Sequence, residues 1–249
     1  MKKIKYIYLL LLFLWAVQGG FSQEKSWGDF DFKIKAGVNI GGTSPMGIPA
    51  QVREIKSFNP LISFSIGADV VRWLDARWGV SSGVRFENKG MTTVARVKEY
   101  AMRLRTESGE MSGLFTGEVE TKVKNGYLNI PLALHYRALT PLSVHAGAYY
   151  ACLLDPSFTG SAYGGHFRQG NPGSESNIGM AEPSYYGFSS ELNRHDVGLL
   201  CGVEWDVLRH LAASFDLSWG LRSVFAKGFT GVSFAMYNVY SNFAFGYRF

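Results

Sequence analysis

Along most of the chain, apolar and polar residues alternate one by one. In residues 30–40, every even position is apolar, from Phe30 to Ile40, and the odd positions carry Asp31, Lys33, Lys35, glycine and asparagine. Successive side chains of a β-strand point to opposite faces, so this pattern predicts a strand with one apolar and one polar face. The same period recurs in residues 62–70, 78–87, 128–137, 142–150, 196–206, 211–222 and 239–249. We therefore predict eight strands.

The connections between these strands alternate in length. Residues 72–77, 138–141 and 207–210 are short links, whereas residues 41–59, 90–125, 153–194 and 223–238 are long. Short turns at one rim and long loops at the other are typical of outer-membrane barrels. Residues 92–124 alternate weakly with mixed charge, which predicts that strands three and four continue beyond the membrane as a solvated hairpin. The break in parity near Asn125-Gly126 predicts a bulge or turn at the rim.

The polar face suggests which side is inside. It consists mostly of Gly, Ser, Asn, Asp, Glu and Arg, and an eight-stranded barrel is just wide enough for side chains to fill its interior. The fold class is therefore expected to be all-β, an eight-stranded antiparallel up-and-down transmembrane β-barrel. A soluble sandwich or lipocalin-type barrel stays open as an alternative, because alternation alone does not say which face is buried.

Large aromatic residues gather where the short turns are predicted. Such residues fit a girdle at a membrane interface, although strands also favour aromatics for other reasons. They are Trp73, Trp78, Tyr136, Trp205, Tyr247 and Phe249.

The N-terminal segment has the layout of a secretory signal peptide. Lys2, Lys3 and Lys5 precede a twelve-residue apolar run, residues 6–17, and Gly20-Phe21-Ser22 supplies small residues for cleavage. We predict a signal peptide over 1–22 and a barrel domain over 23–249. An uncleaved N-terminal anchor is the alternative, but a helix of twelve apolar residues is too short to span a bilayer. Because the leader holds three lysines and no acidic residue, the formal charge falls from +5 to +2. This low charge argues against nucleic acid as a partner.

Some interior positions carry groups that are capable of chemistry. His135 and His145 are symmetric about residue 140, so they are expected to face each other across a hairpin, either as a metal pair or pH-sensitive plug or as ordinary polar packing. Catalysis by the carboxylates is the alternative to ion pairing, and we assign no catalytic, cofactor-binding or metal-binding residue. The charged residues placed in the lumen are Asp69, Glu87, Asp196, Glu204, Asp206, Asp216, Arg85, Arg137 and Arg222.

Two cysteines, Cys152 and Cys201, fall on the apolar face of neighbouring strands. The compartment permits a disulfide, but the long loop between the strands leaves their register open. Unpaired thiols are favoured. The third long connection, residues 153–194, is rich in Gly, Ser and Tyr, as suits an exposed binding surface or a flexible cover.

Several segments resemble the PorT-like outer-membrane β-barrel family of Bacteroidota, which shares its architecture with small OmpA/OmpX-type barrels. The most specific is residues 127–137, with Pro131 inside a strand, where a bulge or a missing ladder bond is needed. The terminal Phe249 looks like the aromatic signal that outer-membrane assembly machinery reads. The other segments are residues 32–39, 147–150, 196–198, 202–204 and 246–249.

The resemblance implies fold and location more than function. Named members of the family are tied to protein secretion and gliding, and no catalytic residues come with the family. We expect a non-enzymatic structural or interaction protein with a side-chain-filled lumen, in the outer membrane, with both termini in the periplasm. Expected partners are outer-membrane lipid, the assembly machinery through Phe249, and a protein at the long loops or the periplasmic face. A narrow channel or transporter and a barrel enzyme acting on lipid or peptide are the alternatives.

Overall fold

The computed structural model describes residues 30–106, 109–170, 173–178, 183–229, 231–232 and 234–249. The predicted signal peptide, residues 1–22, lies outside the described residues and stays a prediction. Asp31–Phe249 form one compact unit built of β-strands and a single-turn 3-10 helix, η2 (Ser189–Glu191). Within the described residues, no helix is long and apolar enough to cross a membrane.

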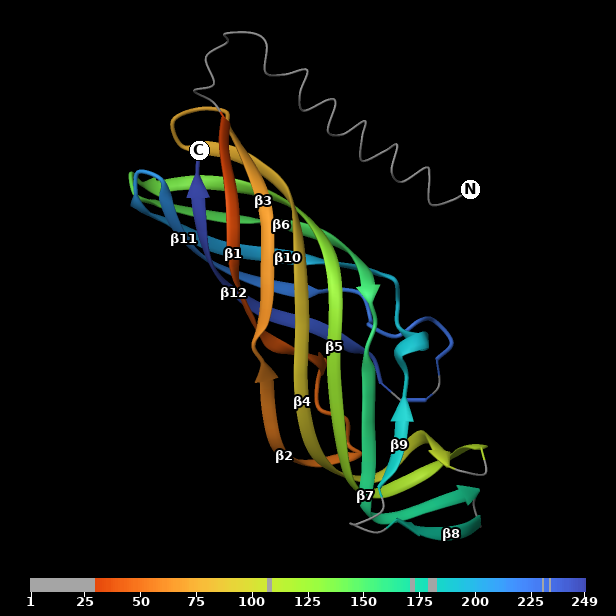
Figure 1. Cartoon of the computed structure of the whole chain (residues 1–249). Helices are drawn as coiled ribbons and strands as arrows, with labels where there is room; N and C mark the ends of the chain where they lie inside the picture. Colours follow the sequence, from red (N-terminus) through yellow and green to blue (C-terminus); the bar gives the residue numbers. More distant parts are fainter. Residues whose placement is uncertain (1–29, 107–108, 171–172, 179–182, 230, 233) are drawn as a thin grey trace, which may run out of the picture. The chain divides into compact units, whose positions relative to one another are not determined.

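Eight of the strands close into a ring (Figure 1). Around the ring the order is β1, β3, β4, β5, β6, β10, β11 and β12, and β12 pairs with β1 to complete it. The neighbouring pairs from β3 round through β12 to β1 are all antiparallel. These strands are β1 (Phe30–Pro45), β3 (Ser63–Trp73), β4 (Trp78–Thr106), β5 (Gly109–Leu139), β6 (Leu142–Asp155), β10 (His195–Leu208), β11 (Leu211–Gly220) and β12 (Met236–Arg248). The predicted eight-stranded barrel is confirmed.

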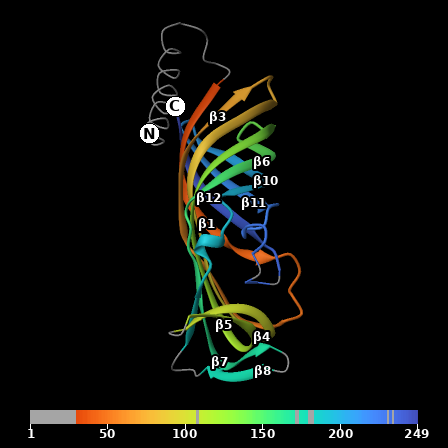
Figure 2. The same cartoon turned by 90° about the vertical axis from the view of Figure 1, so that its right-hand side faces the viewer.

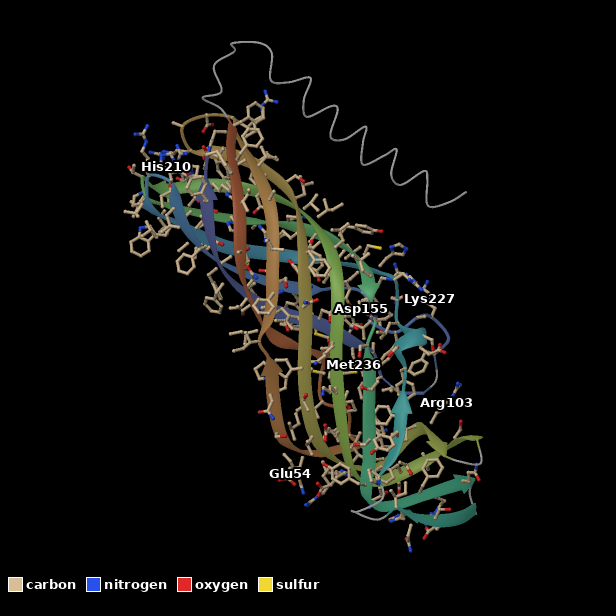
Figure 3. The ribbon with its side chains drawn as sticks, in the orientation of Figure 1. Glu54, Arg103, Asp155, His210, Lys227 and Met236 are labelled. Carbon is tan, nitrogen blue, oxygen red and sulfur yellow. The ribbon has the colours of Figure 1, made fainter. Side chains whose placement is uncertain are left out.

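Short turns join β3 to β4, β5 to β6 and β10 to β11 at one end of the barrel, which we call the short-turn rim. His210 marks this rim in Figure 3. In the β3–β4 turn the Asp75 carboxylate accepts hydrogen bonds of 2.7 Å from the backbone N–H groups of Arg77 and Trp78. These bonds lower the pKa of Asp75 and fix the turn. The opposite end, where the long connections lie, is the long-connection rim.

Beyond the long-connection rim, β4 and β5 continue as a paired hairpin up to Thr106↔Gly109. The predicted hairpin is confirmed, but it is only partly solvated, because Val97, Phe115 and Val119 are buried. Of the other three long connections, residues 41–59 and 153–194 contain strands, so the expectation that these two are loops is wrong. Their strands are β2 (Val52–Leu61), which pairs with β4, and β7 (Phe158–Gly170), β8 (Gly173–Ile178) and β9 (Ser184–Gly187), of which β7 pairs with β5. The described part of residues 223–238 forms no strand before β12 begins at Met236. We call residues 92–121 with β2, β7, β8 and β9 the extension (Figures 1 and 2).

Some glycines of residues 153–194 serve close packing between strands. At Gly165, an added Cβ would lie 2.0 Å from the carbonyl oxygen of Thr116 on β5. Only glycine permits this close approach of the two backbones. The glycine-rich composition therefore marks a strand, β7, which the sequence pattern presented as a loop.

Burial in the barrel is inverted relative to a soluble protein. Lys33 is 2% exposed, whereas its neighbour Ile34 is 49% exposed. The same inversion holds on the other barrel strands, where the polar positions face the interior and large apolar side chains form an outer belt. A large exposed apolar surface that runs round the barrel marks contact with lipid or with a partner protein. The soluble sandwich alternative is therefore wrong.

Five of the six predicted girdle aromatics lie as expected at the short-turn rim. Trp78 and Tyr136 pack together with ring centroids 4.8 Å apart, as do Tyr247 and Phe249 at 5.1 Å, and Trp205 is exposed. Trp73 is an error of the prediction. It shares the parity of the buried residues Asp69 and Val71, so it turns inward.

Trp73 helps to close the interior at the short-turn rim. Its indole Nε1 donates a hydrogen bond of 2.8 Å to Asp31, and the Arg137 guanidinium lies 3.9 Å from its ring centroid. The space for the indole comes from Gly79 on β4, where an added Cβ would lie 2.9 Å from the Trp73 ring. A cation–π contact of this kind holds the indole in place.

Two irregularities in β5 follow the sequence predictions. The β4–β5 ladder passes from Ser82↔Leu132 directly to Arg85↔Asn129, and the Ser82 hydroxyl donates to the Pro131 carbonyl at 3.0 Å. The ladder is therefore interrupted at Pro131, as predicted for a residue that has no backbone N–H to donate. The predicted bulge is confirmed as a shift in the β5–β6 register between Gly126 and Tyr127.

Candidate functional site: the closed lumen and the chamber above it

Arg85 lies in the barrel interior and binds two carboxylates from different strands. Its Nη2 and Nε donate to Asp69 on β3 at 2.6 and 3.1 Å. Its Nη1 donates to Asp216 on β11 at 2.9 Å. A bidentate contact fixes both the distance and the plane of the two groups. Arg85 therefore ties opposite parts of the barrel wall together across the lumen.

A second cation pair extends this network towards the short-turn rim. Lys33 on β1 forms an ion pair with Glu204 on β10, and Lys35 lies 2.7 Å from Glu204 and 3.3 Å from Asp69. All of these side chains are buried. Since Asp69 also binds Arg85, the five groups Lys33, Lys35, Glu204, Asp69 and Arg85 form one continuous network. We call this network, together with Asp216, the ionic plug.

The two predicted histidines meet as expected. His135 on β5 and His145 on β6 are direct cross-strand partners, and their rings stack at 4.7 Å. His145 Nε2 lies 2.6 Å from Asp216 Oδ1, which joins it to the ionic plug, and His135 Nε2 lies 2.8 Å from the Ser81 hydroxyl. Among the described residues, no group of three or more His, Cys, Asp or Glu is arranged to hold a metal ion. The geometry favours polar packing over a metal pair.

Nearer the long-connection rim, Lys89 is buried among aromatic rings. Its Nζ lies 5.0–5.6 Å from the ring centroids of Tyr127, Tyr149 and Tyr240, and 3.6 Å from Glu87 Oε2. Cation–π contacts of this kind gain strength when the cation is desolvated. Three strands besides β4 supply the rings, so this tyrosine cage also crosses the lumen.

Asp196 is held in the same layer by neutral donors. The Tyr149 hydroxyl donates to its Oδ2 at 3.1 Å and the Asn238 amide donates at 2.9 Å. Asn238 also donates to the Tyr127 hydroxyl at 3.3 Å. The layer therefore holds a carboxylate by hydrogen bonds without a direct ion pair from the described residues.

Not every predicted lumen charge belongs to the interior. Asp206 pairs with Arg248 at the short-turn rim, and Arg137 covers Trp73 there. Arg222 is exposed and follows the end of β11, where it contacts Asn193, so its placement in the lumen is wrong. The predicted set of lumen charges does not include the main cations of the interior, which are Lys33, Lys35 and Lys89. All three occupy positions of the alternating pattern that face the interior.

The cysteines are free thiols, as favoured from the sequence. The β6–β10 register sets Cys152 opposite His195 and Cys201 opposite Ala146. The two residues are therefore separated by six positions along the strand pair, well beyond the reach of a disulfide.

From the plug towards the long-connection rim, the interior of the barrel changes from polar to apolar. A cluster of buried hydrophobic side chains begins around Met91 and Val123 and continues into the extension through Phe115, Phe158 and Phe188. The extension thus shares one continuous hydrophobic core with this end of the barrel, which stabilises the strands that were expected to be loops. Within it lies a cavity of about 140 Å³, which we call the chamber.

Comparison with known proteins relates most of the chain to one family. The family described as outer membrane protein beta-barrel domain matches residues 21–226. No curated protein matches the chain.

Solved structures that are similar to this chain include three bacterial proteins of low sequence identity. Ail, the attachment invasion locus protein of Yersinia pestis, is 10% identical with a TM-score of 0.40, over 89% of this chain and 99% of that chain. Neisserial surface protein A is 10% identical with a TM-score of 0.37, over 88% and 97%. The outer membrane protein OprG from Pseudomonas aeruginosa is 12% identical with a TM-score of 0.38, over 89% and 96%.

Proposed function

Because the chain belongs to the family of outer membrane protein beta-barrel domains, we propose that it is a closed barrel that presents the extension to a partner protein outside the cell. The chain is an outer-membrane β-barrel protein. Its proposed role is structural or interaction-based, without catalysis. Within the family, the segments around Pro131 and Phe249 support a PorT-like barrel of Bacteroidota, with a link to protein secretion.

One observation carries this proposal: the ionic plug fills the lumen. Arg85, Asp69 and Asp216 bridge β3, β4 and β11, and Lys35 with Glu204 connects them to β1 and β10. These groups leave little room for an aqueous path in a ring of eight strands. A barrel of this kind serves as a rigid membrane anchor for what stands above its rim.

The proposed orientation puts the long-connection rim outside and the short turns in the periplasm, as in other outer-membrane barrels. The ends of β1 and β12 at the short-turn rim then lie on the periplasmic side, so that Phe249 is available to assembly machinery. The outer belt contacts lipid. A partner protein contacts the extension, where the side chain of Tyr185 on β9 is 64% exposed.

The extension offers a preordered surface. β9 pairs with both β4 and β7, and the Tyr186 hydroxyl lies 2.7 Å from Thr121 Oγ1. A surface fixed in this way loses little conformational freedom when a partner binds. For this reason we take Tyr185 as the probe position.

The test uses a membrane-impermeant, thiol-reactive photocrosslinker on intact cells. Tyr185→Cys is compared with Leu139→Cys, an exposed position at the short-turn rim, both in a Cys152→Ser, Cys201→Ser background. We expect the Tyr185→Cys protein to be labelled on intact cells and to form one discrete adduct on irradiation. The Leu139→Cys protein is expected to react only after the cells are broken.

Two results count against the proposal. If Leu139→Cys but not Tyr185→Cys is labelled on intact cells, the barrel has the opposite orientation in the membrane. Labelling of Tyr185→Cys without a discrete adduct contradicts a partner at this surface.

A further inference from the structure

The chamber is a partly open cavity whose wall is supplied by different elements of the chain. The end of β1, the strands β2, β4 and β5, and the segment before β12 each supply part of its wall. In Figure 3, Met236 lies between His210 at the short-turn rim and Arg103 on the β4 strand of the extension. None of the described lining residues is charged.

Two hydroxyls in the wall, those of Tyr186 and Thr43, are already engaged with protein partners. The Tyr186 hydroxyl donates to the Glu120 carbonyl at 2.7 Å and lies 2.7 Å from Thr121 Oγ1. The Thr43 hydroxyl donates to Asn238 Oδ1 at 2.9 Å. Burial raises the pKa of Tyr186, so its hydroxyl stays neutral. Water needs two to four polar partners to occupy a cavity, and the hydroxyls of Tyr186 and Thr43 are committed to protein partners.

From this wall we propose that the chamber is a binding site for a compact, uncharged apolar molecule the size of a single aromatic ring. The volume of about 140 Å³ is close to that of dry, apolar cavities of about 150 Å³ that take up benzene. A charged ligand would lose its hydration without gaining a partner. A whole membrane lipid is too large for this volume.

The chamber has an apolar entrance at the protein surface and a polar boundary on the side of the barrel lumen. Ile48, Ile55 and Phe58 belong to the chamber wall and are also exposed, Ile48 by 66%. Ile55 and Phe58 lie on β2, which is an edge strand of the described sheet, and Ile48 precedes it. We therefore place the entrance to the chamber at these exposed apolar side chains. Between the chamber and the ionic plug lies the polar layer formed by Asn238, Asp196 and the tyrosine cage. A ligand therefore stops in the chamber and does not proceed into the lumen.

The test follows methionine methyl groups by NMR in the mature protein, labelled with [ε-13C]methionine and inserted into phospholipid nanodiscs. Met91 and Met236 line the chamber, whereas Met46 is exposed and lies outside it. Toluene is the probe. We expect saturable shifts of the Met91 and Met236 methyl signals, with the Met46 signal unmoved.

Filling the chamber supplies the control. Ala95→Phe on β4 places a ring in the cavity and is expected to abolish the shifts, while Ala213→Phe on β11, on the outer face of the barrel, leaves them intact. Heat-dependent gel mobility verifies folding, and Val97→Phe replaces Ala95→Phe if the latter does not fold.

Two outcomes overturn the proposal. Linear, unsaturated shifts that are equal in the wild type and in the filled variant mean only partition into lipid. Broadening of the Met91 signal by a lipid with a nitroxide near the end of its acyl chain, without a response to toluene, means that a membrane acyl chain occupies the chamber. The crosslinking from Tyr185 is independent of either result.

Discussion

Replacing Arg85 with alanine is expected to lower the free energy of unfolding by about 3–5 kcal/mol, because a buried ion pair that loses one partner leaves uncompensated charge. Two carboxylates depend on this guanidinium, Asp69 at 2.6 Å and Asp216 at 2.9 Å. Lys35 still faces Asp69 in the variant, whereas the direct partner that Asp216 keeps among the described residues is His145. The loss therefore falls mainly on the β4–β11 bridge.

Urea-induced unfolding of the barrel in lipid vesicles measures this change. Arg96→Ala is the matched control, because Arg96 pairs with Glu54 at 3.5 Å in an exposed position of the extension. Exposed pairs contribute between about 0 and 1 kcal/mol. If Arg85→Ala costs no more than Arg96→Ala, the ionic plug does not stabilise the barrel and the account of the lumen is wrong.

The second large effect is expected on the outer face. Leu132→Arg places a charge midway along the barrel-spanning part of β5, at a side chain that is 59% exposed. Arginine at the bilayer midplane of a barrel costs about 2–4 kcal/mol. In a soluble protein, the same exposed substitution would change stability by no more than about 0.5 kcal/mol.

Leu139→Arg is the control for depth, because Leu139 is equally apolar and exposed but ends β5 at the short-turn rim. Near an interface the cost falls to about 0–1 kcal/mol. The free energies of unfolding of both variants are compared in the same vesicles. Equal costs at the two positions would contradict a lipid-facing belt whose centre lies near Leu132.

Periodicity predicted the barrel strands well because membrane and lumen impose opposite demands on successive residues. Lys33 and Ile34 are neighbours in sequence, yet one is buried with Glu204 and the other faces outward. The histidine pair was also predictable, since a short turn fixes the register of a hairpin and brings His135 opposite His145.

What the sequence did not predict depends on contacts between distant strands. Glycines of β7 resemble a loop until Gly165 is seen against Thr116 of β5. The cage around Lys89 needs rings from β5, β6 and β12, and no local period relates those three strands. Trp73 was misplaced because its aromatic character was given more weight than its parity. The chamber likewise depends on residues that are far apart in the sequence, from β1, β2, β4, β5 and the segment before β12.

The claim that the lumen is closed is tested most directly by electrical recording from the purified protein in planar lipid bilayers. We expect no steady conductance above that of the protein-free bilayer, because Arg85, Lys35 and their carboxylate partners fill the interior. Heat-dependent mobility of the same sample verifies that the barrel is folded. Steady open events of ionic size from folded protein would contradict the plugged lumen and favour a narrow channel.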